Sequence, residues 1–196
     1  MKYSQNDEQK YILQCVSHIQ NGRFLDIGAH DGVTFSNTRA LWDNGWTGVY
    51  VEPAQEVVPK LKENAGPDCQ IVEAAIGTTD GHMKFYSSNG DMVGTLSDSH
   101  KTLWSTQINF SETDVDVITI DTLKKRIGVQ FDFINIDVEG VNLDVFKQFD
   151  WTIWKPTCVC IEYECHGEFI ANTMKRYGYE QVYLSSENIV FKRQYF

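Results

Sequence analysis

The feature that most limits the fold of this chain is a regular alternation of short apolar runs and amphipathic segments in its first 75 residues. Apolar runs cover 23–27, 47–51 and 69–75, and helical patterns lie between them, one ending near residue 44 and one at 54–64. Strands and helices that alternate at this spacing are typical of a parallel sheet with helices on both faces. The sequence therefore predicts an α/β fold with a doubly wound sheet.

The second half of the chain continues the pattern. Its most apolar segment, FDFINIDV at 131–138, is a nearly continuous run, which suits a central strand covered on both faces. A helix is predicted through Val145, Phe146 and Phe149. Further strands and helices are expected at 115–120, 122–126, 157–163, 168–177, 180–184 and 188–193.

The remaining segments complete a single predicted domain over 1–196. Apolar residues at Ile12, Cys15, Val16 and Ile19 predict an amphipathic helix within 1–22. Residues 82–88 alternate like a hairpin strand. No repeat or linker divides the chain.

Residues 89–113 are predicted to form a long polar loop. The segment carries isolated Met92, Trp104 and Phe110. Loops of this length are uncommon in compact domains and often serve function. We therefore expect a lid or a wall of an acceptor site, and the alternative is a surface insertion whose aromatic side chains fill the edge of the core.

Charge and cysteine content exclude several classes of protein. The formal net charge is -10, which disfavours attraction to nucleic acid or to an anionic membrane. Five cysteines are an odd number and favour a reducing compartment over a disulfide framework. The first ten residues lack the apolar core of a signal peptide, and no apolar run reaches the ~18 residues of a membrane span. A cytoplasmic protein without an integral membrane segment is expected, and its oligomeric state cannot be read.

The first predicted strand ends in FLDIGAHDG, where Asp26 precedes a turn bracketed by Gly28 and Gly32. A dinucleotide fingerprint would need G-x-G-x-x-G, but His30 and Val33 stand at the later glycine positions. An acid with G-x-x-x-G instead suits a zwitterionic amino-acid group, whose ammonium faces Asp26 and whose carboxylate faces free helix N–H groups. A tight turn that binds no ligand is the alternative.

The second predicted strand ends in Glu52, about 20 residues after this turn. An acid at that place can accept both hydroxyls of a ribose. Pro53 would shape an adenine wall, and Ala74 and Ala75 are small enough for an adenine edge to approach the backbone. Taken alone, Glu52 could equally be a solvated strand end.

Four segments together, DIGAHDGVTFSNT, GWTGVYVEP, EAAIG and NIDVEG, resemble the FkbM family of S-adenosylmethionine-dependent methyltransferases. The resemblance extends in order from about residue 23 to 193. It implies a Rossmann-like class I methyltransferase fold, with a mostly parallel seven-stranded sheet and an antiparallel last strand. It also implies methyl transfer, usually to a hydroxyl oxygen of a sugar, glycan or natural product, with S-adenosylhomocysteine as the product.

The resemblance places one group of residues around the cofactor: Asp26, Gly28, Gly32, Ser36, Asn37, Glu52, Ala75 and Asp137. Ala29 and His30 in the turn, with Pro53 and Ala74, complete the predicted cofactor set. Two positions depart from the family pattern. Members often carry Lys before the IDVEG block and an acid two residues after it, where this chain has Asn135 and Asn142.

Acidic residues of IDVEG are the predicted acceptor side. Asp137 and Glu139 follow a central strand, where open α/β sheets bind ligands, and could orient or deprotonate an acceptor or hold a metal. Capping of the next helix is the alternative for Glu139. His166 is the best candidate for a general base, and Glu162 could face the same cleft. No metal site is predicted: the spacing of Cys158, Cys160, Cys165 and His166 matches no zinc pattern, and a divalent metal is possible but not predicted.

The predicted function is therefore S-adenosylmethionine-dependent O-methylation of a small-molecule or glycan hydroxyl. A non-catalytic module that binds a nucleotide or S-adenosylmethionine is the alternative. Methylation of nucleic acid is disfavoured by the acidic charge and by the missing D/N-P-P-Y/F signature. The identity of the acceptor cannot be read from the sequence.

Overall fold

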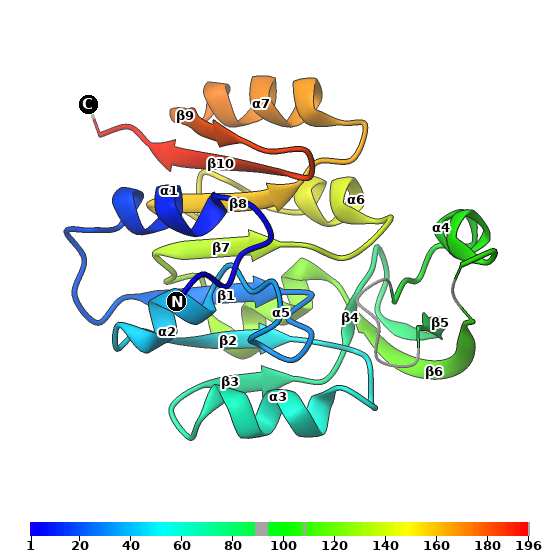
Figure 1. Cartoon of the computed structure of the whole chain (residues 1–196). Coiled ribbons are helices and arrows are strands. Elements are labelled where there is room, and N and C mark those ends of the chain that lie inside the picture. Colours follow the sequence, from blue (N-terminus) through cyan, green and yellow to red (C-terminus); the bar gives the residue numbers. More distant parts are fainter. Residues whose placement is uncertain (89–93, 108, 196) are drawn as a thin grey trace.

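The computed structural model describes residues 1–88, 94–107 and 109–195. Seven strands form a central sheet in the order β3-β2-β1-β7-β8-β10-β9 (Figure 1). Their bounds are β1 Arg23–Ile27, β2 Thr47–Val51, β3 Gln70–Val72, β7 Phe133–Ile136, β8 Cys158–Glu162, β9 Tyr179–Leu184 and β10 Asn188–Arg193. The first five of these strands in the order are parallel, and β10 is antiparallel to both β8 and β9. This confirms the doubly wound, mostly parallel sheet with an antiparallel last strand.

Helices cover both faces of the central sheet because its strands are apolar on both sides. Phe24 packs in one core cluster, with side chains of α1 (Glu8–Cys15), α2 (Arg39–Asp43) and α3 (Val58–Ala65). Its neighbour Leu25 points to the opposite cluster, which α5 (Ile120–Ile127), α6 (Asn142–Lys147) and α7 (Gly167–Arg176) cover. Successive strand residues point to opposite faces, so one apolar run serves both layers.

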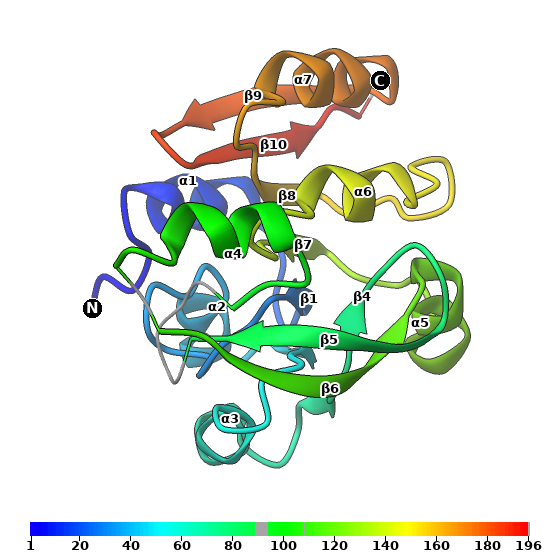
Figure 2. The ribbon, with the colours of Figure 1, turned by 90° about the vertical axis from the view of Figure 1, so that its right-hand side faces the viewer.

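A second, three-stranded sheet lies beyond the carboxyl ends of the central strands (Figure 1). It consists of β4 (Ala75–Ile76), β6 (Ser111–Ile118) and β5 (Gly81–Ser87), and helix α4 (Asp98–Trp104) lies between β5 and β6 in the chain. Figure 2 shows α4 in front of the ends of β7 and β8. This second sheet therefore brings a separate part of the chain to the edge of the sheet where α/β folds bind ligands.

The predicted long loop at 89–113 is wrong in part, because this range contains α4 and the start of β6. The helix begins at an N-cap, Ser97, whose hydroxyl accepts a hydrogen bond from the N–H of His100. None of the helical residues is buried, so the segment has no apolar periodicity that the sequence could reveal. Met92 lies outside the described residues.

The helix predicted between the GAHDG turn and about residue 44 ends where expected but starts later, since α2 begins only at Arg39. Between the turn and this helix, the carboxylate of Asp31 accepts hydrogen bonds from the N–H groups of Val33 and Thr34. These local bonds satisfy backbone donors that a helix N-terminus would have left free. The described part of the chain has no helix both long and apolar enough to cross a membrane.

Candidate active site

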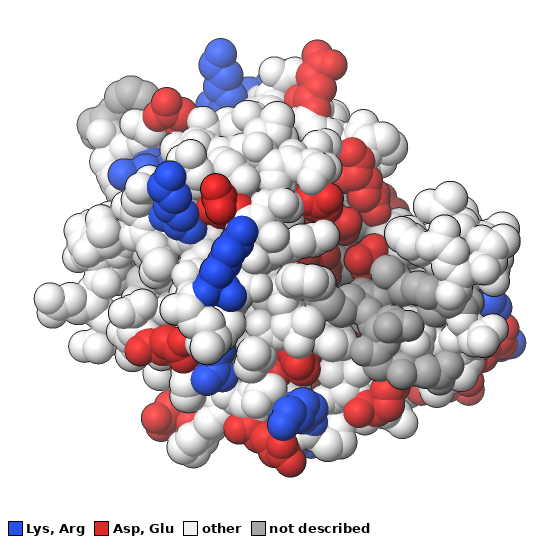
Figure 3. Space-filling model, viewed as in Figure 1, with Lys and Arg blue, Asp and Glu red and all other residues white. Residues whose placement is uncertain are grey.

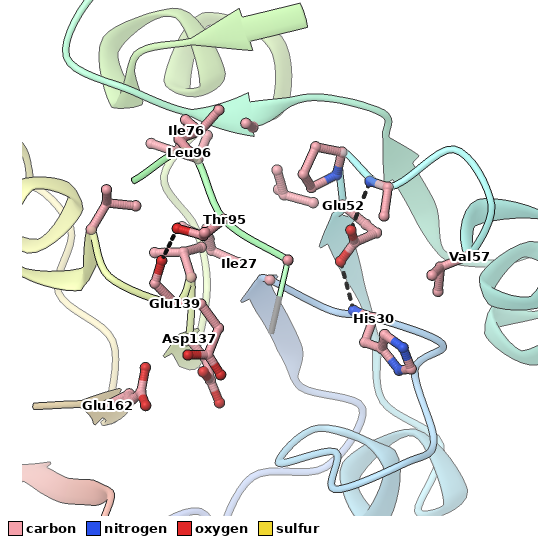
Figure 4. A pocket seen from close by; sticks show the side chains of 18 of the residues that line it. Ile27, His30, Glu52, Val57, Ile76, Thr95, Leu96, Asp137, Glu139 and Glu162 are labelled. Atoms are coloured by element: carbon pink, nitrogen blue, oxygen red, sulfur yellow. Dashed lines mark hydrogen bonds between the residues drawn. The ribbon is translucent and has the colours of Figure 1, made fainter. Parts of the chain in front are cut away.

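A cavity of about 380 Å³ lies where the carboxyl ends of the central strands meet the second sheet. Its walls come from the ends of β1, β2, β7 and β8, from β4 and β5, and from the segment that leads into α4. Figure 4 shows Glu52 on one side of it and the carboxylates of Asp137 and Glu162 on the other. The volume is in the range of small-molecule and cofactor sites.

Glu52 directly follows β2 and is only 6% exposed. Its two carboxylate oxygens accept hydrogen bonds from the backbone N–H groups of His30 and Ala54, each at 2.8 Å (Figure 4). Burial raises the pKa of this carboxyl to about 7, because the two backbone donors only partly replace water. Each oxygen keeps a further lone pair, so a pair of ribose hydroxyls would supply the missing donors.

Gly28 directly follows β1 and packs against the backbone of Asp137, which directly follows β7. A Cβ atom here would lie 1.7 Å from the carbonyl oxygen of Asp137, and the backbone has φ +85°. Both facts require glycine. The close approach of two strand ends, together with space for a ligand at the cavity wall, explains this glycine.

Asp26 does not line the cavity, contrary to the prediction that it faces the ammonium of a ligand. Its carboxylate accepts hydrogen bonds from Thr38 Oγ1 at 2.5 Å and from Asn135 Nδ2 at 2.9 Å. Asn135 stands opposite it on β7, and its amide oxygen accepts a hydrogen bond from Asn37 Nδ2 at 3.1 Å. Burial raises the pKa of Asp26 to about 6. The departure from the family pattern at Asn135 therefore belongs to a buried network beneath the site.

The structure divides the predicted cofactor residues into two groups. Eight of them line the cavity: Gly28, His30, Asn37, Glu52, Pro53, Ala74, Ala75 and Asp137. The other four, Asp26, Ala29, Gly32 and Ser36, lie behind its wall. Ser36 Oγ, for example, accepts hydrogen bonds from the N–H groups of Thr38 and Arg39 at the start of α2. None of these four residues lines the cavity.

Three carboxylates form a cluster at the acceptor side of the cavity. One oxygen each from Asp137, Glu139 and Glu162 lie within 4.8 Å of one another. Burial, followed by the charges of Glu162 and Glu139, raises the pKa of Asp137 well above its ordinary value. Burial and the charge of Glu139 likewise raise the pKa of Glu162 to about 7. The cluster therefore favours binding of a proton or a cation.

Neighbouring side chains fix two of these acids. Asn142 Nδ2 donates to Glu162 Oε2 at 2.5 Å, and His100 Nε2 lies 3.1 Å from Glu139 Oε2. Glu139 raises the pKa of His100 through this contact. Asn142, the second departure from the family pattern, thus orients an acid of the site. Glu139 also has φ 31°, a left-handed conformation that non-glycine residues adopt mainly where function or packing demands it.

His166 does not line the cavity and is no longer the best candidate for a base. It stands at the N-cap of α7, with its ring near Cys165 Sγ at 3.5 Å. The histidine beside the acidic cluster is His100 of α4, which sequence reasoning missed. His100 and Trp104 are four residues apart on this helix, and Trp104 Nε1 lies 3.2 Å from His100 Nε2. The four-residue spacing of His100 and Trp104 was the one signal in the sequence that could have indicated His100. It is informative only when the segment is known to be helical.

The strand order, the antiparallel last strand and the cavity at the strand ends define the fold of Rossmann-like class I methyltransferases. A family model for the methyltransferase FkbM domain matches residues 26–180, which is more than half of the chain. The chain belongs to the FkbM methyltransferase family, and its cofactor is S-adenosylmethionine. A comparison with curated proteins found no match.

One solved structure shares the fold at low identity, and two matches with lower scores are given beside it. The C-terminal domain of precorrin-6Y C5,15-methyltransferase from Rhodobacter capsulatus matches with a TM-score of 0.52 and 9% identity, over 95% of this chain and 88% of that one. A TehB-like S-adenosylmethionine-dependent methyltransferase from Corynebacterium glutamicum has a TM-score of 0.46 and 12% identity, over 97% and 89%. The fibrillarin pre-rRNA processing protein of Methanococcus jannaschii has 0.48 and 11%, over 95% and 74%. At these identities the first match shows the fold alone, and we infer nothing from the two lower scores.

Proposed function

We propose that this methyltransferase acts on a hydroxyl oxygen of a small molecule, such as a sugar, a glycan or a natural product. The observation that carries the proposal is that Glu52 and the acidic cluster line one cavity from opposite sides. One side offers acceptors for a ribose, and the other offers carboxylates to an acceptor hydroxyl. A single cavity therefore carries groups suited to the cofactor and groups suited to the methyl acceptor.

The cofactor end is formed by residues from three strand ends. Glu52 would accept hydrogen bonds from the ribose hydroxyls, and Pro53, Ala74 and Ala75 would border the adenine. Gly28, His30 and Asn37 are left for the amino-acid group of the cofactor. When bound, S-adenosylmethionine supplies a methyl group made electrophilic by its sulfonium, and S-adenosylhomocysteine remains.

The acceptor end is assigned to the acidic cluster. Asp137 would position the acceptor hydroxyl, and a carboxylate oxygen of Glu139 would accept its proton as the oxygen becomes bonded to the methyl carbon. His100 would hold Glu139 in place through the contact at Oε2. General-base help of this kind is typically worth ~10²–10⁴-fold in rate.

The charge of the cavity supports an acceptor without phosphate. Among the described residues that line it, six are acidic and none is Lys or Arg. Figure 3 shows Asp and Glu side chains gathered between the main body and the part of the chain that carries α4. A phosphate group would be repelled here, so nucleic acids and phosphorylated acceptors fit poorly.

We further propose that the part of the chain around α4 is a wall or lid of the acceptor site, within one domain over 1–196. Trp104 lines the cavity, and Thr95 Oγ1 donates to the carbonyl oxygen of Glu139 at 2.5 Å.

A cytoplasmic location is proposed because all five cysteines are free.

A transfer assay tests the proposal. The purified protein, with S-adenosylmethionine labelled at the methyl carbon, would be incubated with a panel of sugars, glycolipids and polyhydroxylated natural products. We expect label in at least one hydroxyl acceptor, and loss of that label in Glu52→Ala. Cofactor binding without transfer to any acceptor would favour a non-catalytic binding module, and transfer to nitrogen or carbon alone would contradict the oxygen assignment.

A further inference from the structure

The acidic cluster has the dimensions of a cation site. Asp137 directly follows β7, Glu139 comes two residues later, and Glu162 ends β8, so adjacent parallel strands bring the three acids together. Their closest oxygens lie within 4.8 Å of one another (Figure 4). Oxygens that share one Mg²⁺ or Ca²⁺ at about 2.0–2.6 Å are separated by at most about 4–5 Å.

No cationic side chain balances this cluster from within the cavity. The described residues that line the cavity include neither Lys nor Arg. His100 contacts Glu139 from behind, and Asn142 contacts Glu162 with a neutral amide. Three carboxyl groups therefore lie together without a Lys or Arg among the described lining residues, and a bound proton or cation would offset their negative charge.

A separate observation points to a ligand at the same place. Asn188 lines the cavity, is only 4% exposed, and has an amide oxygen, Oδ1, with no hydrogen-bond partner in the described structure. It stands directly opposite Glu162 in the antiparallel pairing of β10 with β8, so both side chains lie on the same face of the sheet. A buried amide oxygen without a partner is uncommon, and Asn oxygens are regular ligands of hard divalent cations.

The contacts of His100 and Asn142 each use one oxygen of an acid of the cluster, and Asp137 and Glu162 share a further hydrogen bond. His100 contacts Oε2 of Glu139, and Asn142 donates to Oε2 of Glu162, so the Oε1 atom of each acid is not used in these contacts. Outer hydrogen bonds that orient carboxylates in this way are typical around bound metals. The two acids are thus held in position before any ion arrives.

We propose that Asp137, Glu139, Glu162 and Asn188 bind one hard divalent cation, Mg²⁺ or Mn²⁺. The donors are all oxygen atoms, which matches the preference of these ions. At the acceptor side, the ion would withdraw charge from an acceptor hydroxyl and lower the pKa of that hydroxyl. This catalytic use rests on the proposed function, whereas binding of the ion does not.

Binding of Mn²⁺ alone tests the site without cofactor, acceptor or methyl transfer. The full chain, stripped with a chelator, would be titrated with Mn²⁺ and followed by electron paramagnetic resonance and calorimetry. We expect one ion per chain, competition by Mg²⁺, and a loss of affinity of at least about tenfold in Glu162→Gln and in Asn188→Leu. Asn188→Asp adds a negative ligand and should tighten binding.

A matched control distinguishes the loss of a metal ligand from the loss of a negative charge elsewhere on the protein. Glu168→Gln removes the same charge from an exposed position in the first turn of α7 and should leave Mn²⁺ affinity unchanged. Circular dichroism melting would verify that each variant is folded. Failure of the folded wild type to bind Mn²⁺ up to about 1 mM, or binding that survives both Glu162→Gln and Asn188→Leu, would overturn the site. Methyl transfer that persists in chelator would remove the ion from the reaction and leave the proposed function intact.

Discussion

The carboxylate of Glu52 accepts a hydrogen bond at 2.8 Å from the backbone N–H of His30, which fastens the end of β2 to the turn after β1. His30 has φ 48°, so this turn carries a left-handed residue where the bond forms. The bond therefore fixes two walls of the cavity relative to each other. It also places a buried acid where a bound ribose would replace the water that burial has removed.

The first prediction concerns the pH dependence of cofactor binding. Burial raises the pKa of Glu52 to about 7 in the unliganded protein, and hydroxyl donors of a ligand would lower it again. The ionised form then binds better, so affinity for S-adenosylhomocysteine should rise with pH through this value. Between about pH 6 and pH 8 we expect a gain of about tenfold, measured by calorimetry.

The control for this prediction is Glu52→Gln, which cannot ionise. Its affinity at about pH 8 should be lower than that of the wild type by roughly 1–3 kcal/mol, and the pH dependence should disappear. Equal affinities of the two proteins, or the same pH profile in both, would show that another group contacts the ribose.

A second prediction concerns stability and the buried network below the cavity. Asn135→Ala leaves Asp26 without one of its two side-chain donors and Asn37 without its acceptor. The free energy of unfolding, from urea denaturation, should fall by about 1–3 kcal/mol or more. Asn172→Ala, at an exposed position of α7, should change it by less than about 0.5 kcal/mol. If Asn135→Ala lowers the free energy of unfolding by less than about 0.5 kcal/mol, water takes over the hydrogen bonds of the amide.

The strands of the central sheet were the most predictable part of the molecule. The bounds of β1 and β2, Arg23–Ile27 and Thr47–Val51, are those expected from the sequence. An apolar run that must be covered on both faces leaves few alternatives, and the flanking turns mark its ends. The acids at the strand ends, Glu52 and Asp137, could be placed in the site for the same reason.

The acceptor side could not be predicted, because it depends on how the second sheet is placed. Helix α4 has no buried residues, and its sequence is as polar as a loop. Nothing local indicates that His100 reaches Glu139, 39 positions later in the chain. His166 seemed suitable because it follows a strand of the central sheet, but it is the N-cap of α7 and does not line the cavity.

The third prediction compares these two histidines. His166→Ala should keep kcat within about twofold, since its ring is outside the cavity. His100→Ala should lower kcat by about 10–100-fold, the range typical for a residue that orients a functional group, with little effect on cofactor affinity. Steady-state kinetics with an acceptor found in the panel would measure both. A larger loss of kcat in His166→Ala than in His100→Ala would favour His166 as the general base.

The last prediction concerns Trp104 as part of the acceptor wall. Trp104 lines the cavity from α4, whereas the residues proposed for the adenine, Pro53, Ala74 and Ala75, line it from the chain around β2 and β4. Trp104→Ala should therefore raise KM for the acceptor by about tenfold, while the dissociation constant of S-adenosylhomocysteine changes by less than about twofold.

Leu103→Ala is the matched control, because Leu103 is the neighbouring residue of the same helix and is 71% exposed. Kinetics and calorimetry on the two variants, with melting curves to verify folding, separate the possible roles. Equal loss of acceptor and cofactor binding in Trp104→Ala would count against a wall specific for the acceptor, and an equal effect of Leu103→Ala would point to a general weakening of α4.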